Sequence, residues 1–249
     1  MSIKLVDVHK AFGPQQVLRG FSLEIEEGQT FSIIGPSGAG KSVTLKHVIR
    51  LIEPDRGEVW VDGQEVGGLR QTDLYELRRN VGYVFQFAAL FDSMTVRENV
   101  AMGLRRIPGL GEDEIQERVS GALARVDLRD VEEKFPAELS GGMQKRAGLA
   151  RAIATEPRYL LYDEPTTGLD PLTTTVIDRL IIRMKEELGV TGVVVTHDME
   201  SAYRVSDRIA MLHDGRVRTV GTPDEIRNTE DVVVRRFIEG RPELRERAK

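Results

Sequence analysis

The chain has 249 residues and a formal net charge of −5, which argues against a protein that binds nucleic acid by neutralising its phosphates. It contains no cysteine, which excludes disulfides, thiol catalysis and thiolate metal sites. Its longest unbroken apolar run, residues 87–91, is far shorter than the roughly 20 residues of a membrane-spanning helix, and its mixed, charged start is unlike a secretory signal. We therefore expect any role at a membrane to be peripheral.

Strand patterns fill the first third of the chain. Alternating or β-branched runs, broken by glycine-containing turns, predict strands at residues 3–8, 17–25, 30–34 and 59–61. Helical spacing follows the third of these at residues 41–52.

Charged, helix-forming residues dominate from about 87 to 155, where the spacing at 112–126 predicts an amphipathic helix. Strand patterns return at 159–162 and 192–196, on either side of a helix pattern at 172–188. Because strands alternate with helices, the sequence predicts a mainly parallel sheet with a helical lobe inserted in it.

A glycine-rich loop follows the predicted strand at 30–34. It matches the pattern G-x-x-x-x-G-K-[ST] with the residues Gly35-Pro36-Ser37-Gly38-Ala39-Gly40-Lys41-Ser42. The glycines let backbone N–H groups approach phosphate oxygens, and the following helix directs its positive N-terminal end at the same anion. Lys41 would contact the β- and γ-phosphates, and the Ser42 hydroxyl is placed to bind Mg²⁺. The strand–loop–helix context predicts a nucleotide site here rather than a plain glycine turn.

Two carboxylates, Asp163 and Glu164, end the apolar strand predicted at 159–162. Such a pair is by itself more often a turn or a helix cap. In an open parallel sheet, however, ligands bind beyond the carboxyl ends of the strands, so the pair should meet the phosphate loop. We then expect Asp163 to hold Mg²⁺, through water, and Glu164 to polarise the attacking water as general base.

The segment Leu139-Ser140-Gly141-Gly142-Met143 precedes a predicted helix at 143–155. Ser140 is a good helix cap, and the two glycines expose backbone N–H groups, so the segment is either a well-capped helix start or a second phosphate site. A second phosphate site makes sense if two chains pair head to tail and complete each other's nucleotide sites. The sequence here resembles the ABC transporter ATPase family, whose signature is LSGGQ. Met143 stands where that glutamine usually is, which leaves backbone contacts intact but puts a side-chain contact to the ribose in question.

The resemblance continues along nearly the whole chain in the family's order. Phe12 matches the aromatic residue that stacks on adenine, and Gln86 matches the glutamine that senses Mg²⁺ and the γ-phosphate. Asp170, in Gly168-Leu169-Asp170, matches the loop that joins the two sites of the dimer, and His197 matches the switch histidine.

These matches imply a set of roles for an enzyme that hydrolyses ATP with Mg²⁺. The catalytic residues would be Glu164, His197 and Lys41. Nucleotide contacts would come from Phe12, from Gly35 to Val43, from Gln86 and from Asp163. Mg²⁺ would be held by Ser42, Gln86 and Asp163. The contacts across the dimer would come from Ser140, Gly141, Gly142, Met143 and Asp170.

The resemblance also implies an α/β fold: a P-loop NTPase (RecA-like) core with a mainly parallel sheet, an N-terminal antiparallel β subdomain and an inserted α-helical subdomain. We expect the core at 1–86 and 156–223, the inserted signature subdomain at 87–155, and a C-terminal helical extension at 224–249. The expected partners are a second copy of the chain and integral-membrane permease subunits, at the cytoplasmic face of a bacterial inner membrane.

The segment 85–96 carries more apolar surface than a solvated loop needs. It is either core of the helical lobe or the groove that receives a short permease helix, and the family favours the groove. This segment, together with LSGGM, is most similar to the ATPase of the Mla or Mce-associated phospholipid transport systems. An importer of amino acids or other small solutes is the alternative, because its ATPases share most of these motifs.

Other functions fit the sequence less well. Repair ATPases of this family carry a very long coiled coil, and translation factors usually carry two cassettes; this chain shows neither. A module that binds ATP without cleaving it would be expected to lack the catalytic carboxylate, whereas Glu164 and His197 are both present. At the end of the chain, apolar positions at 232–238 predict either docking on the partner protomer or on a small regulatory subunit, or packing on the chain's own core.

Overall fold

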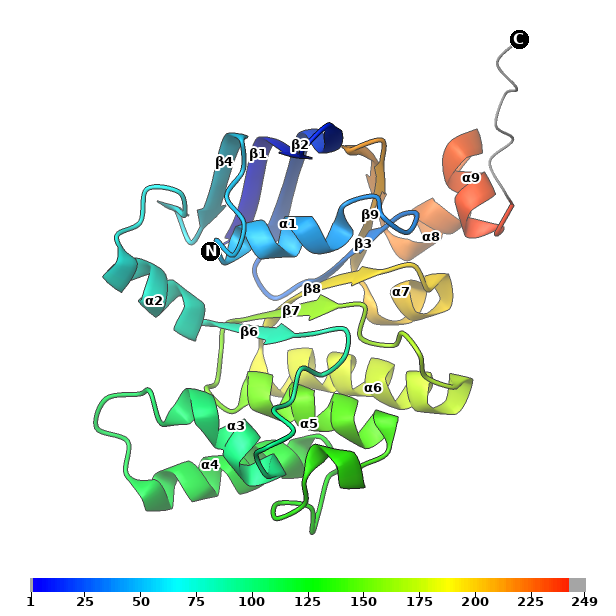
Figure 1. Ribbon diagram of the computed structural model, residues 1–249. Coiled ribbons are helices and arrows are strands. Elements are labelled where there is room, and N and C mark those ends of the chain that lie inside the picture. Colours follow the sequence, from blue (N-terminus) through cyan, green and yellow to red (C-terminus); the bar gives the residue numbers. More distant parts are fainter. Residues whose placement is uncertain (1, 242–249) are drawn as a thin grey trace.

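The computed structural model describes residues 2–241 and contains two sheets. The smaller sheet has the order β2-β1-β4-β5 and is antiparallel throughout (Figure 1). Buried and exposed residues alternate along much of its second strand, because one face of this sheet packs on the core and the other meets solvent. Its strands are β1 (Ser2–Phe12), β2 (Gln15–Glu26), β4 (Arg56–Val61) and β5 (Gln64–Glu65).

The larger sheet has the order β10-β9-β3-β8-β7-β6 and is parallel except for β10, which pairs antiparallel with β9. All residues of β3, β7 and β8 are buried, as expected for parallel strands covered on both faces. The predicted mainly parallel α/β fold is therefore confirmed. The strands are β3 (Thr30–Ile34), β6 (Val81–Val84), β7 (Tyr159–Asp163), β8 (Thr191–Thr196), β9 (Arg208–His213) and β10 (Arg216–Gly221).

Helix α1 (Lys41–Val48) lies between the two sheets and contacts β4 on one side and β7 and β8 on the other. On the opposite side of the larger sheet, α5 (Gly141–Ile153) contacts β6, and α6 (Pro171–Leu188) contacts β8 and α7 (Met199–Val205) (Figure 1). Helices α3 (Val96–Leu104) and α4 (Glu112–Arg125) pack on α5 at the far end of the molecule. Helix α2 (Gln71–Arg79) precedes β6, and a short 3-10 turn, Pro136–Glu138, precedes the signature segment.

The predicted helix at 41–52 ends early, at Val48. The backbone N–H groups of Leu51 and Ile52 both donate to the Lys46 carbonyl, and Arg50 has φ of 48°, so the chain turns out of the helix there. The division into a core and a lobe at 87–155 stays a prediction, because helices of that segment share one apolar cluster with α6 and β7.

Helices α8 (Pro223–Arg227) and α9 (Val232–Ile238) follow the last strand. Val234 is fully buried in a cluster with Ile34 and Met211, so α9 packs on the chain's own core, while Val232 remains exposed. Residues 242–249 of the predicted extension lie outside the described residues.

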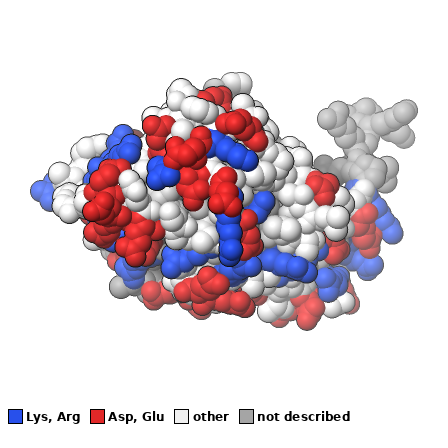
Figure 2. Space-filling model, turned by 90° about the horizontal axis from the view of Figure 1, so that it is seen from below, with Lys and Arg blue, Asp and Glu red and all other residues white. Residues whose placement is uncertain are grey.

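Within residues 2–241 no helix is both long enough and apolar enough to span a membrane. Figure 2 shows the face seen from below, where positive and negative side chains are intermixed. The described part of this face therefore forms no continuous basic surface of the kind that neutralises phosphates.

Candidate nucleotide site

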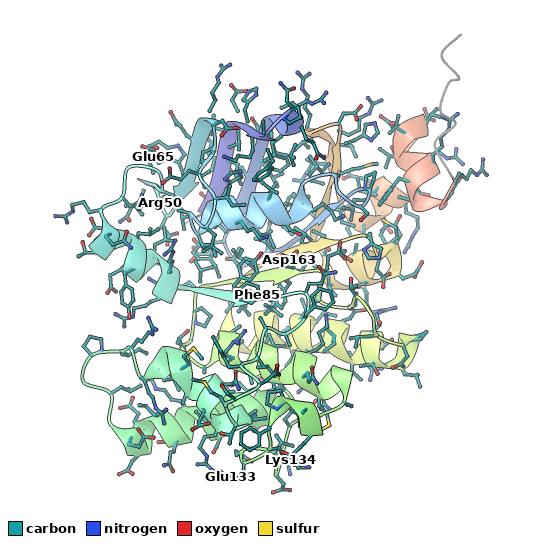
Figure 3. The ribbon with its side chains drawn as sticks, viewed as in Figure 1. Arg50, Glu65, Phe85, Glu133, Lys134 and Asp163 are labelled. Carbon is teal, nitrogen blue, oxygen red and sulfur yellow. The ribbon has the colours of Figure 1, made fainter. Side chains whose placement is uncertain are left out.

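Four neighbouring parallel strands, in the order β3-β8-β7-β6, bring the predicted site residues to one edge of the larger sheet. The phosphate loop follows β3, His197 follows β8, Asp163 ends β7, and Gln86 lies just beyond β6. The register places Ile34 opposite Thr196, and Asp163 opposite Val195. Figure 3 labels Asp163 and Phe85 at this edge. The carboxyl ends of the strands thus collect residues that are far apart in the sequence.

Glycine is required in the phosphate loop for two reasons. Gly40 has φ of 104°, a conformation that other residues rarely adopt, and a Cβ there would lie 2.5 Å from Cγ1 of Val17. A Cβ on Gly35 would lie 2.3 Å from the Leu212 carbonyl oxygen. By contrast, open space surrounds the Cβ position of Gly38. The loop therefore packs closely against its own core while one of its turns stays open to a ligand.

Lys41 is the first residue of α1, and its side chain is buried to 5% exposure. Its Nζ donates to the carbonyl oxygens of Gly35 at 2.9 Å and Pro36 at 3.2 Å. It also lies 3.4 Å from Oε1 of Glu164. The ammonium group is thus held between the loop and the acidic pair, with the orphan N–H groups of the first helical turn beside it.

Asp163 is held by two hydroxyl groups. Ser42 Oγ donates to Oδ1 at 2.6 Å, and Tyr83 OH donates to Oδ2 at 2.9 Å. Burial, and then the neighbouring carboxylate, raise the pKa of Tyr83, so its hydroxyl keeps its proton and remains a donor. The contact between Ser42 and Asp163 places two of the predicted Mg²⁺ ligands side by side.

Glu164 meets three groups that fix its carboxylate. Nδ1 of His197 lies 2.8 Å from Oε2, and Thr167 Oγ1 donates to the same oxygen at 3.2 Å. The other oxygen faces Lys41. Glu164 has φ of 49°, and its N–H donates to the Val195 carbonyl. Such a strained backbone persists only where its surroundings hold it, and it is common at functional sites.

A cavity of about 340 Å³ opens over these residues. Phe12 and Val17 form one wall, and the phosphate loop, Gln86, Glu164 and His197 form the others. An exposed aromatic ring, an open glycine turn, a buried ammonium and a pair of hydroxyl and carboxylate oxygens are the groups that a nucleotide with Mg²⁺ requires. The residues present therefore fit both a nucleotide and a Mg²⁺ ion. Pro36 and Ala39 line a neighbouring hollow that shares Val17, Ser37 and Gly38 with this cavity.

The signature segment lies elsewhere. Ser140 caps α5, and its Oγ accepts from the Met143 N–H at 3.3 Å. A separate hollow of about 460 Å³ shares no lining residue with the cavity at Lys41. Its lining includes Ser140, Gly141, Gly142, Met143 and Asp170. The structure thus brings the residues predicted to act across a dimer together with one another, and not with Lys41 of the same chain.

The segment that carries Gln86 is tied to α5. Lys145 Nζ donates to the Gln86 carbonyl, and Arg151 donates to the carbonyls of Ala88 and Ala89 at 2.8 and 2.6 Å. Burial lowers the pKa of both cations. Ala88 and Ala89 have φ of 58° and 49°, so this backbone is strained as well.

Two aromatic side chains of the same segment, Phe87 and Phe91, are 79% and 50% exposed. The polar groups of Asn99, which is fully buried, hold the Phe91 N–H and carbonyl at 2.7 and 3.1 Å. Exposed rings on a backbone that is held by hydrogen bonds favour the interpretation of this segment as an apolar contact surface, and not as core of the helical lobe.

Sequence reasoning missed Tyr83, Thr167 and Lys145 as residues of this site. One signal could have found Tyr83. Parallel pairing places it beside Leu161, and alternate residues of a strand share a face, so it lies on the same face as Asp163. Lys145 reaches Gln86 across 59 residues of sequence, with no spacing rule to indicate it.

Comparison with protein-family models matches residues 18–167 to the family described as ABC transporter. The chain belongs to the ABC transporter family. The matched region runs from before the phosphate loop to beyond the acidic pair, and so spans the signature segment as well.

Similar proteins, some of which align with the chain well beyond this region, agree with the assignment. The chain is 41% identical to the protein TRIGALACTOSYLDIACYLGLYCEROL 3, chloroplastic, of Arabidopsis thaliana, over 96% of this chain and 73% of that protein. It is 45% identical to the methionine import ATP-binding protein MetN of Carboxydothermus hydrogenoformans, over 82% of this chain and 60% of MetN. A solved dimeric structure of the ATP-binding cassette MJ0796, in a post-hydrolysis state with ADP and Pi, superposes with a TM-score of 0.81 at 36% identity. That superposition covers 89% of this chain and 98% of the other.

Proposed function

We propose that this ABC transporter cassette is a Mg²⁺-dependent ATPase that drives a membrane transporter. The observation that carries the proposal is the convergence of Lys41, Glu164 and His197 beside the Ser42–Asp163 pair in one cavity. Likeness to a cassette solved with ADP and Pi supports the same activity.

In this proposal the residues of the cavity divide the work of binding and hydrolysis. Lys41 binds the β- and γ-phosphates, and Phe12 stacks on the adenine. Ser42, Asp163 and Gln86 would hold Mg²⁺, which supplies positive charge to the phosphates when bound. Glu164 takes a proton from the attacking water, and His197 orients that carboxylate and reaches toward the γ-phosphate.

We further propose that two copies work head to tail. One chain has the phosphate loop and the signature segment in separate hollows, so a site that combines them would need a second copy of the chain. In an isologous pair, Ser140 of each copy would close the Lys41 site of the other. The dimeric state of the MJ0796 cassette supports this arrangement.

Phe87 and Phe91 mark the surface that we propose for the permease. Both rings are exposed on a segment that Lys145, Arg151 and Asn99 hold from within the cassette. Burying such rings contributes roughly 25 cal/mol for each Å² of apolar surface removed from water. This contact would place the cassette at the cytoplasmic face of a bacterial inner membrane, as a peripheral subunit. The α8–α9 extension would bind the partner protomer or a small regulatory subunit through its exposed side.

We propose a phospholipid as the cargo, as in the Mla and Mce-associated systems. In support, the name of the Arabidopsis relative includes that of a glycerolipid. The alternative, an importer of amino acids or other small solutes, is favoured by the likeness to a methionine import protein.

The test is the whole complex in liposomes with a labelled phospholipid. ATP-driven lipid movement is the expected result. Stimulation by an amino acid with its binding protein, and no movement of lipid, would favour the importer.

A further inference from the structure

The carboxylate of Asp178 is fully buried, and none of the steps above uses it. It projects from α6 and accepts hydrogen bonds from two residues of α7, the Ser201 hydroxyl at 2.5 Å and the Arg204 guanidinium. Burial raises the pKa of Asp178, while both of these donors act in the opposite direction. A buried carboxylate is tolerated only when it is paired and hydrogen-bonded, so its partners fix α7 against α6.

Ser201 connects this carboxylate to the turn that carries His197. Its backbone N–H donates to Oδ1 of Asp198, the N-cap of α7, at 3.1 Å, while its hydroxyl donates to Asp178. Asp198 follows His197 in the chain, and its own N–H donates to Thr196 Oγ1 at 3.0 Å. Ser201 and Thr196 are fully buried. The His197 turn is therefore fixed between the end of β8 and α6.

The N-terminal end of α6 lies at the signature hollow. Its N-cap is Asp170, whose Oδ1 accepts from the N–H groups of Leu172 and Thr173 at 3.0 and 3.1 Å. At 1.5 Å per residue, Asp178 lies about 12 Å along the helix from that cap. Because a regular helix moves as one body, a displacement of the Asp170 end reaches Asp178 and, through Ser201, the start of α7.

We propose that Asp178 is a positioning residue that acts through Ser201 and Asp198 to hold His197 against Glu164. It thereby ties the 2.8 Å contact between His197 and Glu164 to the position of the Asp170 turn. The inference rests on the proposed catalytic roles of Glu164 and His197, and it adds to them a path by which the signature face controls their geometry.

Two variants test this path in the full-length chain. Asp178→Leu replaces the carboxylate by an apolar group of similar size. It leaves the Ser201 hydroxyl and the partly exposed Arg204 guanidinium without their acceptor, so some loss of stability is expected and is measured separately from the rate. Ser201→Ala removes only the hydroxyl and serves as the second, milder variant. Misplacing a catalytic group by about 1 Å can cost roughly 100-fold in rate, so we expect kcat to fall by about 10- to 100-fold with KM for ATP unchanged.

The matched control is Lys185→Met. It removes the ion pair at 2.6 Å between Lys185 of α6 and Asp207, whose carboxylate also accepts from the Thr30 N–H at the start of β3. Among the described residues, the hydrogen bonds of this pair do not lead to the His197 turn. This variant should keep the parental kcat. Thermal unfolding of all variants then separates a general loss of stability from a specific loss of rate.

The deciding measurement is a double-mutant cycle that combines Asp178→Leu with His197→Ala, in which the rate of each variant is measured by single-turnover hydrolysis. If Asp178 acts through His197, then Asp178→Leu lowers kcat in the parental chain and has no further effect in the His197→Ala chain. Equal, additive losses in both backgrounds would overturn this inference and leave the proposed function standing. A His197→Ala chain with parental kcat would refute the proposed role of His197, and this inference with it.

Discussion

The hydrogen bond from Tyr83 to Asp163 gives a direct test of the proposed Mg²⁺ site. Tyr83→Phe removes the hydroxyl that holds Oδ2 at 2.9 Å, but keeps the ring, whose centroid lies 4.4 Å from that of Phe85. Ser42 contacts the other carboxylate oxygen, Oδ1, so the Tyr83 bond is expected to persist when Mg²⁺ binds on the Oδ1 side. Without it, the carboxylate is free to rotate and must be ordered by the metal itself.

The magnitude follows from the type of bond. A hydrogen bond to a charged group contributes about 1.5–3 kcal/mol net, and every 1.4 kcal/mol corresponds to about tenfold in affinity. If the whole of this contribution is lost from Mg²⁺ binding, the Mg²⁺ concentration that half-activates ATP hydrolysis rises by about 10- to 100-fold. Binding of Mn²⁺, followed by electron paramagnetic resonance in the presence of ATP, should weaken in parallel.

Phe85→Leu is the matched control, because it removes the ring contact and leaves the hydroxyl in place. It should leave half-activation by Mg²⁺ unchanged. If Tyr83→Phe has parental Mg²⁺ dependence and only a lower unfolding temperature, the Tyr83 bond is merely structural and the reasoning is wrong.

Two further predictions concern the assembly. Mixing Lys41→Ala chains with Ser140→Arg chains should restore ATP hydrolysis that neither has alone, because the mixed pair contains one undamaged composite site; crosslinks that place Ser140 next to Lys41 of the same chain would contradict this. Phe91→Asp should uncouple transport and weaken binding to the permease while nucleotide binding is spared, since Phe91 is half exposed and away from the cavity; parental transport in liposomes would rule out the proposed docking surface.

The sequence predicted those parts of the site that depend on local patterns. The phosphate loop is a continuous motif between a strand and a helix, and the acidic pair ends a strand whose residues are all buried. The carboxyl-end rule for parallel sheets then sufficed to place Asp163 near Ser42, although they are 121 residues apart.

The contacts that hold these residues in place could not be predicted in the same way. Tyr83 contacts Asp163 across 80 residues of sequence, and Asp178 contacts Ser201 across 23. In the sequence alone, these residue types are equally consistent with ordinary core and surface positions. Only the packing of α6 on α7 shows that Asp178 is buried. The early end of α1 depends on a local turn at Arg50 that the helical spacing of the apolar residues does not reveal.

The central claim is that the chain hydrolyses ATP with Glu164 as general base, and one measurement tests it most directly. Glu164→Gln keeps the shape of the side chain that faces Lys41 and His197, but it cannot accept a proton. Loss of a general base typically costs about 10²–10⁴-fold in rate, so steady-state turnover should nearly stop while ATP binding, measured by equilibrium titration, stays intact. Lys41→Ala, measured alongside, should lose ATP binding as well. Turnover of Glu164→Gln at close to the parental rate would contradict the account.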